Sequence, residues 1–312
     1  MRMPLAVRTI SLSLLAATAL ASPLAAQPKT IAERLGHPAN AKLVIIHADD
    51  LGVAHSVDSA SFAALDARTV SSASIMMPTP WVTEVAAYAK AHPDADLGLH
   101  LTLTSEWKTY RWGSVAPASE VRSLFAPDGT LPDETAAVAA KASPAEVERE
   151  LRAQVERALA LGIRPTHLDS HMGALFTTPA LFAAYAKVAH DYGLPFLAPR
   201  PTSDAERKIV SVGDRDVVVD AVVSPGPEVP AEQWTQWYVD AIRNLKPGLT
   251  YMIVHLGRDD AELQAVTVDH VPWGSAWRGR DAAAVASPAF AAALREAGVV
   301  VVRWRDLQRL VR

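Results

Sequence analysis

The chain has 312 residues, of which 50% are hydrophobic and 21% charged, and this composition excludes a disordered, collagenous or low-complexity protein. The 34 acidic residues outnumber the 30 basic ones, and the basic residues form no run, so nucleic acid is not an expected partner. The sequence has no cysteine, which excludes thiolate catalysis, cysteine-bound zinc and disulfide exchange.

The first residues in chain order have the pattern of a secretory signal peptide. Arg2 and Arg8 precede an apolar stretch at 10–20, and small residues follow up to Ala26. This pattern predicts a signal peptide over 1–26 and an exported protein, periplasmic or secreted. A retained membrane anchor is the alternative, but it needs about 18 or more apolar residues. We therefore expect no integral membrane span after cleavage.

A single domain is predicted over 42–312, after an N-terminal lead-in at 27–41. It opens with a buried strand at 42–50, which contains an uninterrupted apolar run. At 96–104, leucines alternate with other residues, and this spacing predicts a strand that points His100 inward. The other predicted elements are strands at 69–76, 165–169, 195–198, 217–223, 249–255 and 299–304, and helices at 56–67, 81–91, 144–161, 179–192, 231–245 and 288–297.

One helix boundary is marked with particular clarity. Ser143, Pro144 and Glu146 stand in the order of a capping box, with serine at the N-cap, proline at the first helical position and glutamate at the third. We therefore expect a helix to begin at Pro144.

The alternation of strands and helices predicts the fold class. Repeated βα units imply a parallel sheet, and about eight such strands can close into a barrel. We predict a single-domain α/β fold that is (β/α) barrel-like, in a distorted or incomplete form, with a doubly wound open sheet as the alternative. The first strand exits through His47-Ala48-Asp49-Asp50-Leu51-Gly52, without a glycine-rich phosphate loop, so nucleotide binding is not expected.

Two long loops are predicted, at 105–142 and at 258–286, and the first, which lacks strong periodicity, is a candidate for a lid or a substrate-binding wall. The segment 105–142 contains Trp107, Tyr110 and Trp112, whose rings could stack on sugars, although aromatic side chains mostly fill cores. The segment 258–286 contains Arg278, which could orient a carboxylate, although an arginine is usually exposed to solvent.

Four predicted strand ends carry polar residues: Asp49 with Asp50, His100, the group His167, Asp169 and His171, and His255. Functional groups of parallel α/β folds gather at the carboxyl ends of the strands. Each residue alone has a structural explanation, as a turn acid or a buried core histidine. Together they predict a site.

Adjacent aspartates in a crowded place are unfavourable unless a cation or hydrogen-bond donors offset their charges. A divalent metal ion would do so, and Asp with His is a suitable ligand set. If 167–171 is extended, its alternate residues share a face, and those that are not ligands can orient the others.

These motifs resemble the YdjC-like carbohydrate deacetylase family, of chitooligosaccharide and hopanoid deacetylase type, which is related to the polysaccharide deacetylases. The resemblance rests on the 47–52 motif, on Gly98-Leu99-His100-Leu101-Thr102-Leu103 and on Pro165-Thr166-His167-Leu168-Asp169-Ser170-His171, and it extends to the strand that ends at His255. It covers the chain from about residue 42 to 304.

The resemblance implies a barrel of the glycoside hydrolase and deacetylase type and a set of roles. Asp50, His100 and His171 would bind one divalent metal ion, Mg²⁺ or Zn²⁺, with Asp49 as general base and His255 as the acid. The implied reaction is hydrolysis of the C–N amide bond of an N-acetylated sugar or glycan. The residues considered for substrate contact are Trp107, Tyr110, Trp112, Asp169 and Arg278.

Many family members carry two more histidines where this sequence has Gly173 and Leu175, a departure that leaves the implied metal ligands in place and leaves the identity of the substrate open. The alternatives are another metal-dependent hydrolase, such as a phosphoesterase or glycosidase, and a carbohydrate-binding barrel without turnover. The oligomeric state is open.

Overall fold

The computed structural model describes residues 29–311, so the predicted signal peptide at 1–26 lies outside the described residues. Its centre is a parallel sheet with the strand order β4-β3-β2-β1-β8-β7, and β9 also pairs with β1. The strands are β1 (Lys42–Leu51), β2 (Ser72–Ile75), β3 (Leu97–Leu101), β4 (Leu168–Ser170), β7 (Ala221–Val223), β8 (Gly248–Val254) and β9 (Val300–Val301).

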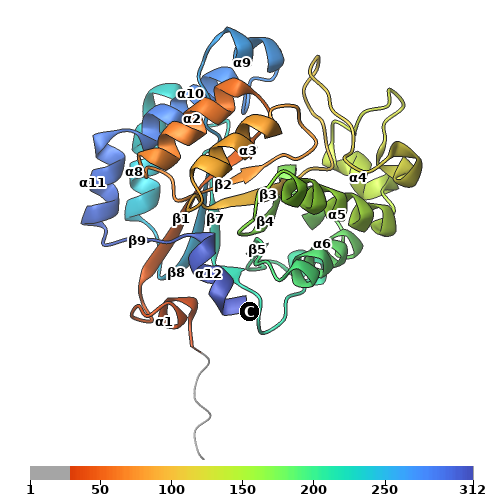
Figure 1. Ribbon diagram of the computed structural model, residues 1–312. Coiled ribbons are helices and arrows are strands. Elements are labelled where there is room, and N and C mark those ends of the chain that lie inside the picture. Colours follow the sequence, from red (N-terminus) through yellow and green to blue (C-terminus); the bar gives the residue numbers. More distant parts are fainter. Residues whose placement is uncertain (1–28, 312) are drawn as a thin grey trace, which may run out of the picture.

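The sheet curls into a half-barrel that is flanked by helices (Figure 1). Beyond β4, a bridge from Leu168 to Phe196 continues the curl toward the short strands β5 (Ala198–Pro199) and β6 (Val218–Val219). The predicted barrel-like α/β fold is therefore confirmed. The incomplete form follows from the shortness of the strands between β4 and β8.

The helices are α1 (Ile31–Arg34), α2 (His55–Asp66), α3 (Val82–Ala91), α4 (Thr135–Lys141), α5 (Pro144–Ala160), α6 (Pro179–Tyr192), α7 (Asp204–Ile209), α8 (Trp234–Arg243), α9 (Ala261–Val266), α10 (Ser275–Val285), α11 (Pro288–Glu296) and α12 (Trp304–Val311). Most helices cover the outer side of the sheet (Figure 1), whereas α1 and α12 pack in the same cluster as the interior residues Leu43 and Ile45. Within the described residues, no helix is both long and apolar enough to cross a bilayer.

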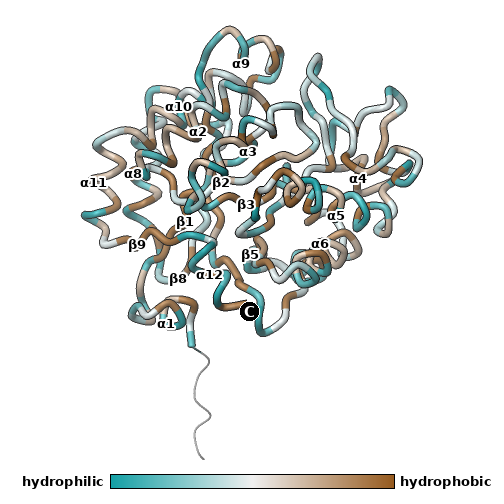
Figure 2. The backbone as a smooth tube through the Cα atoms, in the orientation of Figure 1, coloured by the Kyte–Doolittle hydropathy of each residue, from teal (hydrophilic) through white to brown (hydrophobic). Residues whose placement is uncertain are grey.

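The central strand β1 shows how the core is divided. Val44 and Ile46 pack in the cluster under the outer helices, whereas Leu43 and Ile45 belong to a second cluster inside the half-barrel. This division follows from the alternation of side chains along a strand. Figure 2 shows the same strand as a hydrophobic stretch in the middle of the molecule. Along the interior face, the apolar positions 43 and 45 are followed by the polar residues His47 and Asp49.

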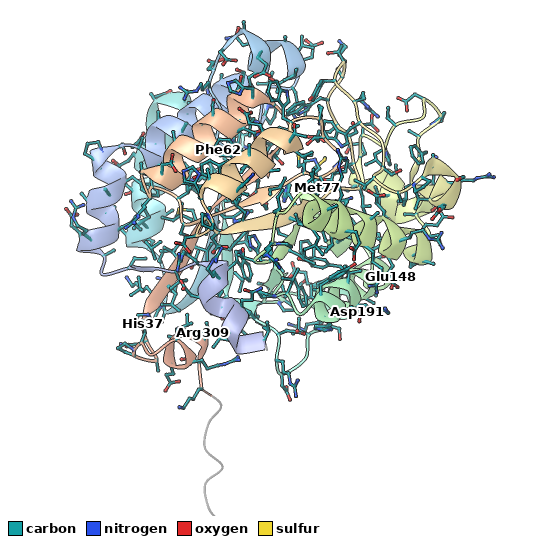
Figure 3. The ribbon with its side chains drawn as sticks, viewed as in Figure 1. His37, Phe62, Met77, Glu148, Asp191 and Arg309 are labelled. Atoms are coloured by element: carbon teal, nitrogen blue, oxygen red, sulfur yellow. The ribbon has the colours of Figure 1, made fainter. Side chains whose placement is uncertain are left out.

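Helix α5 begins at Pro144, as the capping-box pattern predicts, but the cap is made differently. The Ser143 side chain makes no capping bond, and the Glu146 carboxylate accepts a hydrogen bond from the Ser123 N–H at 2.7 Å instead. The boundary signal is therefore correct, while the glutamate serves to anchor the preceding segment. On the outer surface, Glu148 of α5 and Asp191 of α6 lie near each other and share the partners Arg152 and Lys187 (Figure 3).

The two segments predicted as irregular differ in outcome. Most of 105–142 lacks regular structure and ends in the short helix α4. The segment 258–286, in contrast, contains α9 and the well-formed helix α10. The expectation of a long loop was wrong there, because Gly279 and the charged residues Arg278, Arg280 and Asp281 around it obscure the helical periodicity.

Candidate functional site

The two adjacent aspartates point into one site because the chain leaves the regular strand between them. Consecutive strand residues normally face opposite sides of a sheet. Asp50 has a φ of 68°, and the pairing of β1 with β2 shifts register between Ala48 and Leu51. Aspartate tolerates this left-handed conformation better than most residues. As a result, Asp49 and Asp50 both face His100, whose Nε2 lies 3.8 Å from Asp49 Oδ2 and 3.4 Å from Asp50 Oδ1.

His100 is oriented by a carboxylate behind it. Its Nδ1 donates to Asp169 Oδ1 at 2.8 Å, which directs Nε2 toward the aspartates. Asp169 is itself held by the hydroxyls of Ser74 and Tyr251, which donate to Oδ2 at 3.0 and 2.8 Å. Asp169 is almost fully buried in this position, behind the histidine and away from a surface that a substrate could reach.

His171 reaches the site from a tight turn. Strand β4 ends at Ser170, and His171 opens a 3-10 helix in which Met172 and Gly173 have φ values of 52° and 67°. The expectation that residues 167–171 form one extended face was therefore wrong. The turn brings His171 Nδ1 to 3.3 Å from Asp50 Oδ1, and His171 Nε2 donates to Glu106 Oε2 at 3.0 Å.

Asp50 Oδ1, His100 Nε2 and His171 Nδ1 converge, since the donor atoms of these three buried residues lie within 4.8 Å of one another. Ligand atoms in a tetrahedral zinc site with bonds of about 2.0–2.1 Å are separated by roughly 3.4 Å. The two separations that involve Asp50 Oδ1, 3.4 and 3.3 Å, agree with this value. The second nitrogen of each histidine is held by a carboxylate, as in many protein metal sites.

The charges at this position favour a cation. Burial acts to lower the pKa of His171, but Glu106 and Asp50 outweigh it and raise that pKa to about 10. Asp50 Oδ1 is buried and has no hydrogen-bond partner among the described residues. A positive charge between Asp50, His100 and His171 would satisfy both observations, so the donor set fits a divalent metal ion.

Arg278 contacts the site from helix α10. Its guanidinium donates from Nη2 to Asp50 Oδ2 at 2.7 Å and from Nε to the Trp273 carbonyl at 2.7 Å. The guanidinium carbon lies 5.7 Å from the centre of the Trp107 ring. Burial acts to raise the pKa of Asp50, but Arg278 and the neighbouring histidines hold it well below its ordinary value. Arg278 therefore neutralises the outer oxygen of Asp50.

Asp49 has a different environment from its neighbour. Burial raises the pKa of Asp49 to about 7, although His100 and His47 act to lower it. A carboxylate whose pKa lies near neutrality is suited to accept a proton in catalysis. Asp49 Oδ2 also lies 3.9 Å from His255 Nε2.

His255 stands at the carboxyl end of β8. Its backbone N–H donates to Asp281 Oδ2 at 2.8 Å, and Asp281 also accepts hydrogen bonds from Trp234 and Tyr238. Burial lowers the pKa of His255 to about 3, so the imidazole is neutral at pH 7. A neutral His255 could act as the acid only after it had gained a proton during the reaction.

The aromatic residues considered for sugar contact form a packed group. Trp107 and Trp112 are buried, with ring centres 5.9 Å apart, and the half-buried Tyr110 lies 5.8 Å from Trp107. The Tyr110 hydroxyl donates to the Val53 carbonyl at 2.8 Å. These contacts close the segment 105–112 over the exit of β1. Trp107 and Trp112 therefore have little ring surface free for a sugar.

The sequence did not single out two residues that complete the cluster, Glu106 and Tyr251. Glu106 follows β3 at the edge of an irregular segment, and Tyr251 lies inside a strand that reads as apolar. The one pattern that could have placed Tyr251 is the alternation of side chains along a strand. Tyr251 pairs with Ile45 of β1, so the two side chains share the interior face, which becomes polar toward the ends of the strands.

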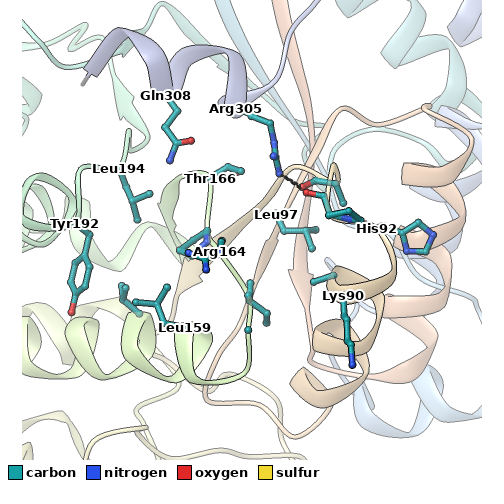
Figure 4. Close-up of a pocket in the computed structure, with 17 residues that line it drawn as sticks. Lys90, His92, Leu97, Leu159, Arg164, Thr166, Tyr192, Leu194, Arg305 and Gln308 are labelled. Carbon is teal, nitrogen blue, oxygen red and sulfur yellow. Dashed lines mark hydrogen bonds between the residues drawn. The ribbon is translucent and has the colours of Figure 1, made fainter.

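A separate pocket of about 560 Å³ lies at the end of the sheet where β3 and β4 begin (Figure 4). It is lined by Leu97, the first residue of β3, by residues that precede β4, including Arg164, and by Arg305 of α12. No member of the aspartate–histidine cluster lines this pocket. It therefore lies at the amino ends of the strands, opposite the site.

The fold and the site together define a class of protein: a curled parallel α/β barrel with a buried aspartate–histidine cluster at the carboxyl edge of its strands. A family model described as YdjC-like protein matches residues 43–296. The chain belongs to this family, and the resemblance noted in the sequence is confirmed.

Curated relatives and a solved structure agree with this assignment. A carbohydrate deacetylase of Thermus thermophilus is 34% identical over 231 residues, covering 72% of this chain and 80% of the relative. A carbohydrate deacetylase of Geobacillus stearothermophilus is 27% identical over 270 residues, covering 85% and 98%. These relatives confirm the expectation of an enzyme. A structure from Enterococcus faecalis, provisionally described as a cellobiose-phosphate cleavage protein, has a TM-score of 0.73 at 22% identity and covers 86% of this chain and 99% of its own, which shows a shared fold.

Proposed function

We propose that this protein is a carbohydrate deacetylase that hydrolyses the acetamide of an N-acetylated sugar with the help of one divalent metal ion. Asp50, His100 and His171 would hold the ion, and Asp49 would be the general base. The names of the curated relatives support the reaction and the substrate class. The observation that carries the proposal is the convergence of three buried donor atoms, with the second nitrogen of each histidine oriented by a carboxylate.

The balance of buried charge supports the metal ion. Four acidic side chains gather here, Asp49, Asp50, Glu106 and Asp169, and among the described residues Arg278 is the one permanently charged cation that pairs with them. Buried charges are costly unless they are paired. A divalent ion would reduce this excess of negative charge.

The residues of the chain have separable tasks in the proposed reaction. A bound divalent ion supplies Lewis acidity and stabilises developing negative charge on an acyl oxygen. Asp49, with its raised pKa, accepts the proton of the attacking water. His255 Nε2 faces Asp49 and can take up this proton and deliver it to the departing amine. The amine leaves as the C–N bond breaks, and acetate is the second product.

The pairing of the carboxylates favours this reaction over glycoside hydrolysis. A glycosidase needs two carboxyl groups that act on the substrate. Here Asp50, Asp169 and Glu106 are each engaged with Arg278 or with a histidine, which leaves Asp49 for proton transfer.

Metal analysis combined with acetate release tests the proposal. The purified protein should contain about one divalent ion per chain and release acetate from members of a panel of N-acetylated sugars and oligosaccharides. Treatment with a chelator should abolish release, and addition of Zn²⁺ or Mg²⁺ should restore it. Full activity in the metal-free protein, or release of sugar or phosphate without acetate, would contradict the proposal.

We also propose that the protein is exported to the periplasm or secreted. The proposal rests on the basic residues, the apolar stretch and the small residues of 1–26. Amino-terminal sequencing of the mature protein should find its start near Gln27. A membrane-bound form that retains Met1 would contradict it.

A further inference from the structure

His47 lies beneath the aspartates and has no role in the function proposed above. It is fully buried, and its ring is stacked on Tyr251 with a centroid distance of 4.8 Å. A second ring, that of His167, meets it edge-on at 5.1 Å. These contacts fix the plane of the imidazole and therefore the direction in which its nitrogens point.

The two nitrogens of His47 have opposite surroundings. Nδ1 is buried and has no hydrogen-bond partner among the described residues, so a proton there would be left unpaired. Nε2 lies 3.0 Å from Asp169 Oδ2, 2.9 Å from Ser74 Oγ and 3.3 Å from Asp49 Oδ1. The proton of this imidazole therefore belongs on Nε2, where it faces two carboxylates.

The Asp169 carboxylate already has hydrogen-bond donors other than His47. Its Oδ2 already accepts from Ser74 and Tyr251, and its Oδ1 accepts from His100. Asp49 is in the opposite position, because its Oδ1 is buried without a hydrogen-bond partner and His47 Nε2 lies 3.3 Å away. The hydrogen bond of His47 Nε2 goes to Ser74 Oγ, and the same nitrogen lies 3.3 Å from the Asp49 oxygen that lacks a donor, so its positive N–H dipole lies next to that oxygen.

We propose that His47 is a positioning residue that holds Asp49 in the orientation needed for proton transfer, an inference that rests on the deacetylase function proposed above. Because His47 also contacts Asp169, which orients His100, one imidazole joins the base to the carboxylate behind a metal ligand. The base then keeps a constant position relative to the site even though it binds no metal itself.

The variant His47→Leu tests this role, since leucine fills part of the space and has no donor. Loss of this polar contact with the base corresponds to a fall in kcat on the order of 10-fold. KM and the bound metal should stay close to the values of the unaltered enzyme, because the substrate and the ion are held by other groups. In His47→Gln the amide restores a donor at similar reach, so this variant should recover a large part of kcat.

His167→Leu is the matched control. His167 is equally buried and meets the His47 ring edge-on, but its polar contacts are with Thr166 and Asp96, away from Asp49. A loss of kcat that is the same in His167→Leu and His47→Leu would show that only packing matters, and would overturn the proposal.

A double-variant cycle with Asp49→Asn separates positioning from other effects. If His47 acts through Asp49, its loss should cost little further activity once Asp49 is already replaced. Additive losses would overturn the proposal, and so would loss of the metal in both His47→Leu and His47→Gln. His47, His167 and Asp169 also lie close enough to one another to hold an ion. If the unaltered enzyme bound two ions per chain and His47→Leu lost one of them, His47 would be a metal ligand, and the proposal would be overturned. Failure of the unaltered enzyme to release acetate would count against the proposed function and not against this inference alone.

Discussion

The site has an inner wall, made of Asp49, Asp50, His100 and Asp169, and an outer wall, made of Glu106, Trp107, Trp273 and Arg278. The inner residues stand at the ends of β1, β3 and β4, which are joined through β2 by backbone hydrogen bonds in a parallel sheet. The outer residues come from the segments before α4 and around the start of α10 and are joined mainly through side chains.

This difference assigns different tasks to the two walls. The strands β1 to β4 are buried on both faces and give their side chains fixed positions, which metal binding and proton transfer require. The outer wall supplies charge balance and orientation to atoms that the inner wall has already placed, as when Arg278 pairs with Asp50 and Glu106 with His171. Substitutions in the inner wall should therefore stop the reaction, while those in the outer wall should weaken it.

The largest effect is expected for the two aspartates of the inner wall. Asp49→Asn keeps the shape of the side chain but cannot accept the proton of water, so activity should fall on the order of 10² to 10⁴-fold while the metal stays bound. Asp50→Asn removes an anionic ligand, so metal affinity itself should fall. Metal content and acetate release distinguish them, with the exposed Asp94→Asn as control. If Asp49→Asn loses its metal and Asp50→Asn keeps it, the two roles are reversed.

A smaller effect is expected for Glu106→Gln in the outer wall. Glutamine keeps a hydrogen bond to His171 but removes the negative charge that makes this histidine a better ligand. Loss of such a partner weakens metal affinity on the order of 10- to 100-fold. Metal titration measures the change, and Asp128→Asn, an exposed change on the same segment, serves as control. Unchanged affinity in Glu106→Gln would show that the outer wall does not tune the metal site.

The buried carboxyl group of Asp58, which lies behind the inner wall, should make the free energy of unfolding depend on pH. Asp58 is buried and accepts a hydrogen bond from the Gly52 N–H at 2.6 Å, at the turn that follows Asp50. Burial raises the pKa of Asp58 to about 8 from an ordinary value near 3.8. Between about pH 4 and pH 8 the folded state therefore keeps a proton on Asp58 that the unfolded state has released. The stability gained from this bound proton is fully present below about pH 4 and is lost as the pH rises through 8.

Asp58→Asn keeps an acceptor for Gly52 and cannot ionise, so it should become more stable relative to the unaltered protein as pH rises from 5 to 8. Urea unfolding at several pH values measures this difference, with exposed Asp66→Asn in the same helix as control. A stability difference that does not change with pH would contradict the expectation.

The smallest effect is expected at the surface of the outer wall. Lys108 pairs with Asp269 and links the two segments of this wall, but both side chains are 64% exposed. Exposed ion pairs contribute about 0–1 kcal/mol. Lys108→Ala should therefore change the free energy of unfolding by no more than this and leave kcat nearly unchanged. A large loss of activity would mean that the pair holds the outer wall closed during the reaction.

The inner wall could be found in the sequence because its residues follow local patterns. Asp49 and Asp50 end an apolar run, and His100 lies on the polar face of an alternating one, so each could be assigned to a strand. The outer wall could not be found in this way. Glu106 lies 65 positions from His171, and Arg278 lies 228 positions from Asp50. No periodicity relates residues so far apart.

The sequence by itself determined the α/β class, the start of α5 and the group of residues at the strand ends, because apolar spacing and capping chemistry act over a few neighbouring positions. The tertiary structure alone decided that His171 leaves the strand, that Arg278 pairs with Asp50 and not with Asp49, and that His47 faces Asp49. These outcomes depend on how buried charges find partners across the fold, and that pairing is settled only when distant segments pack together.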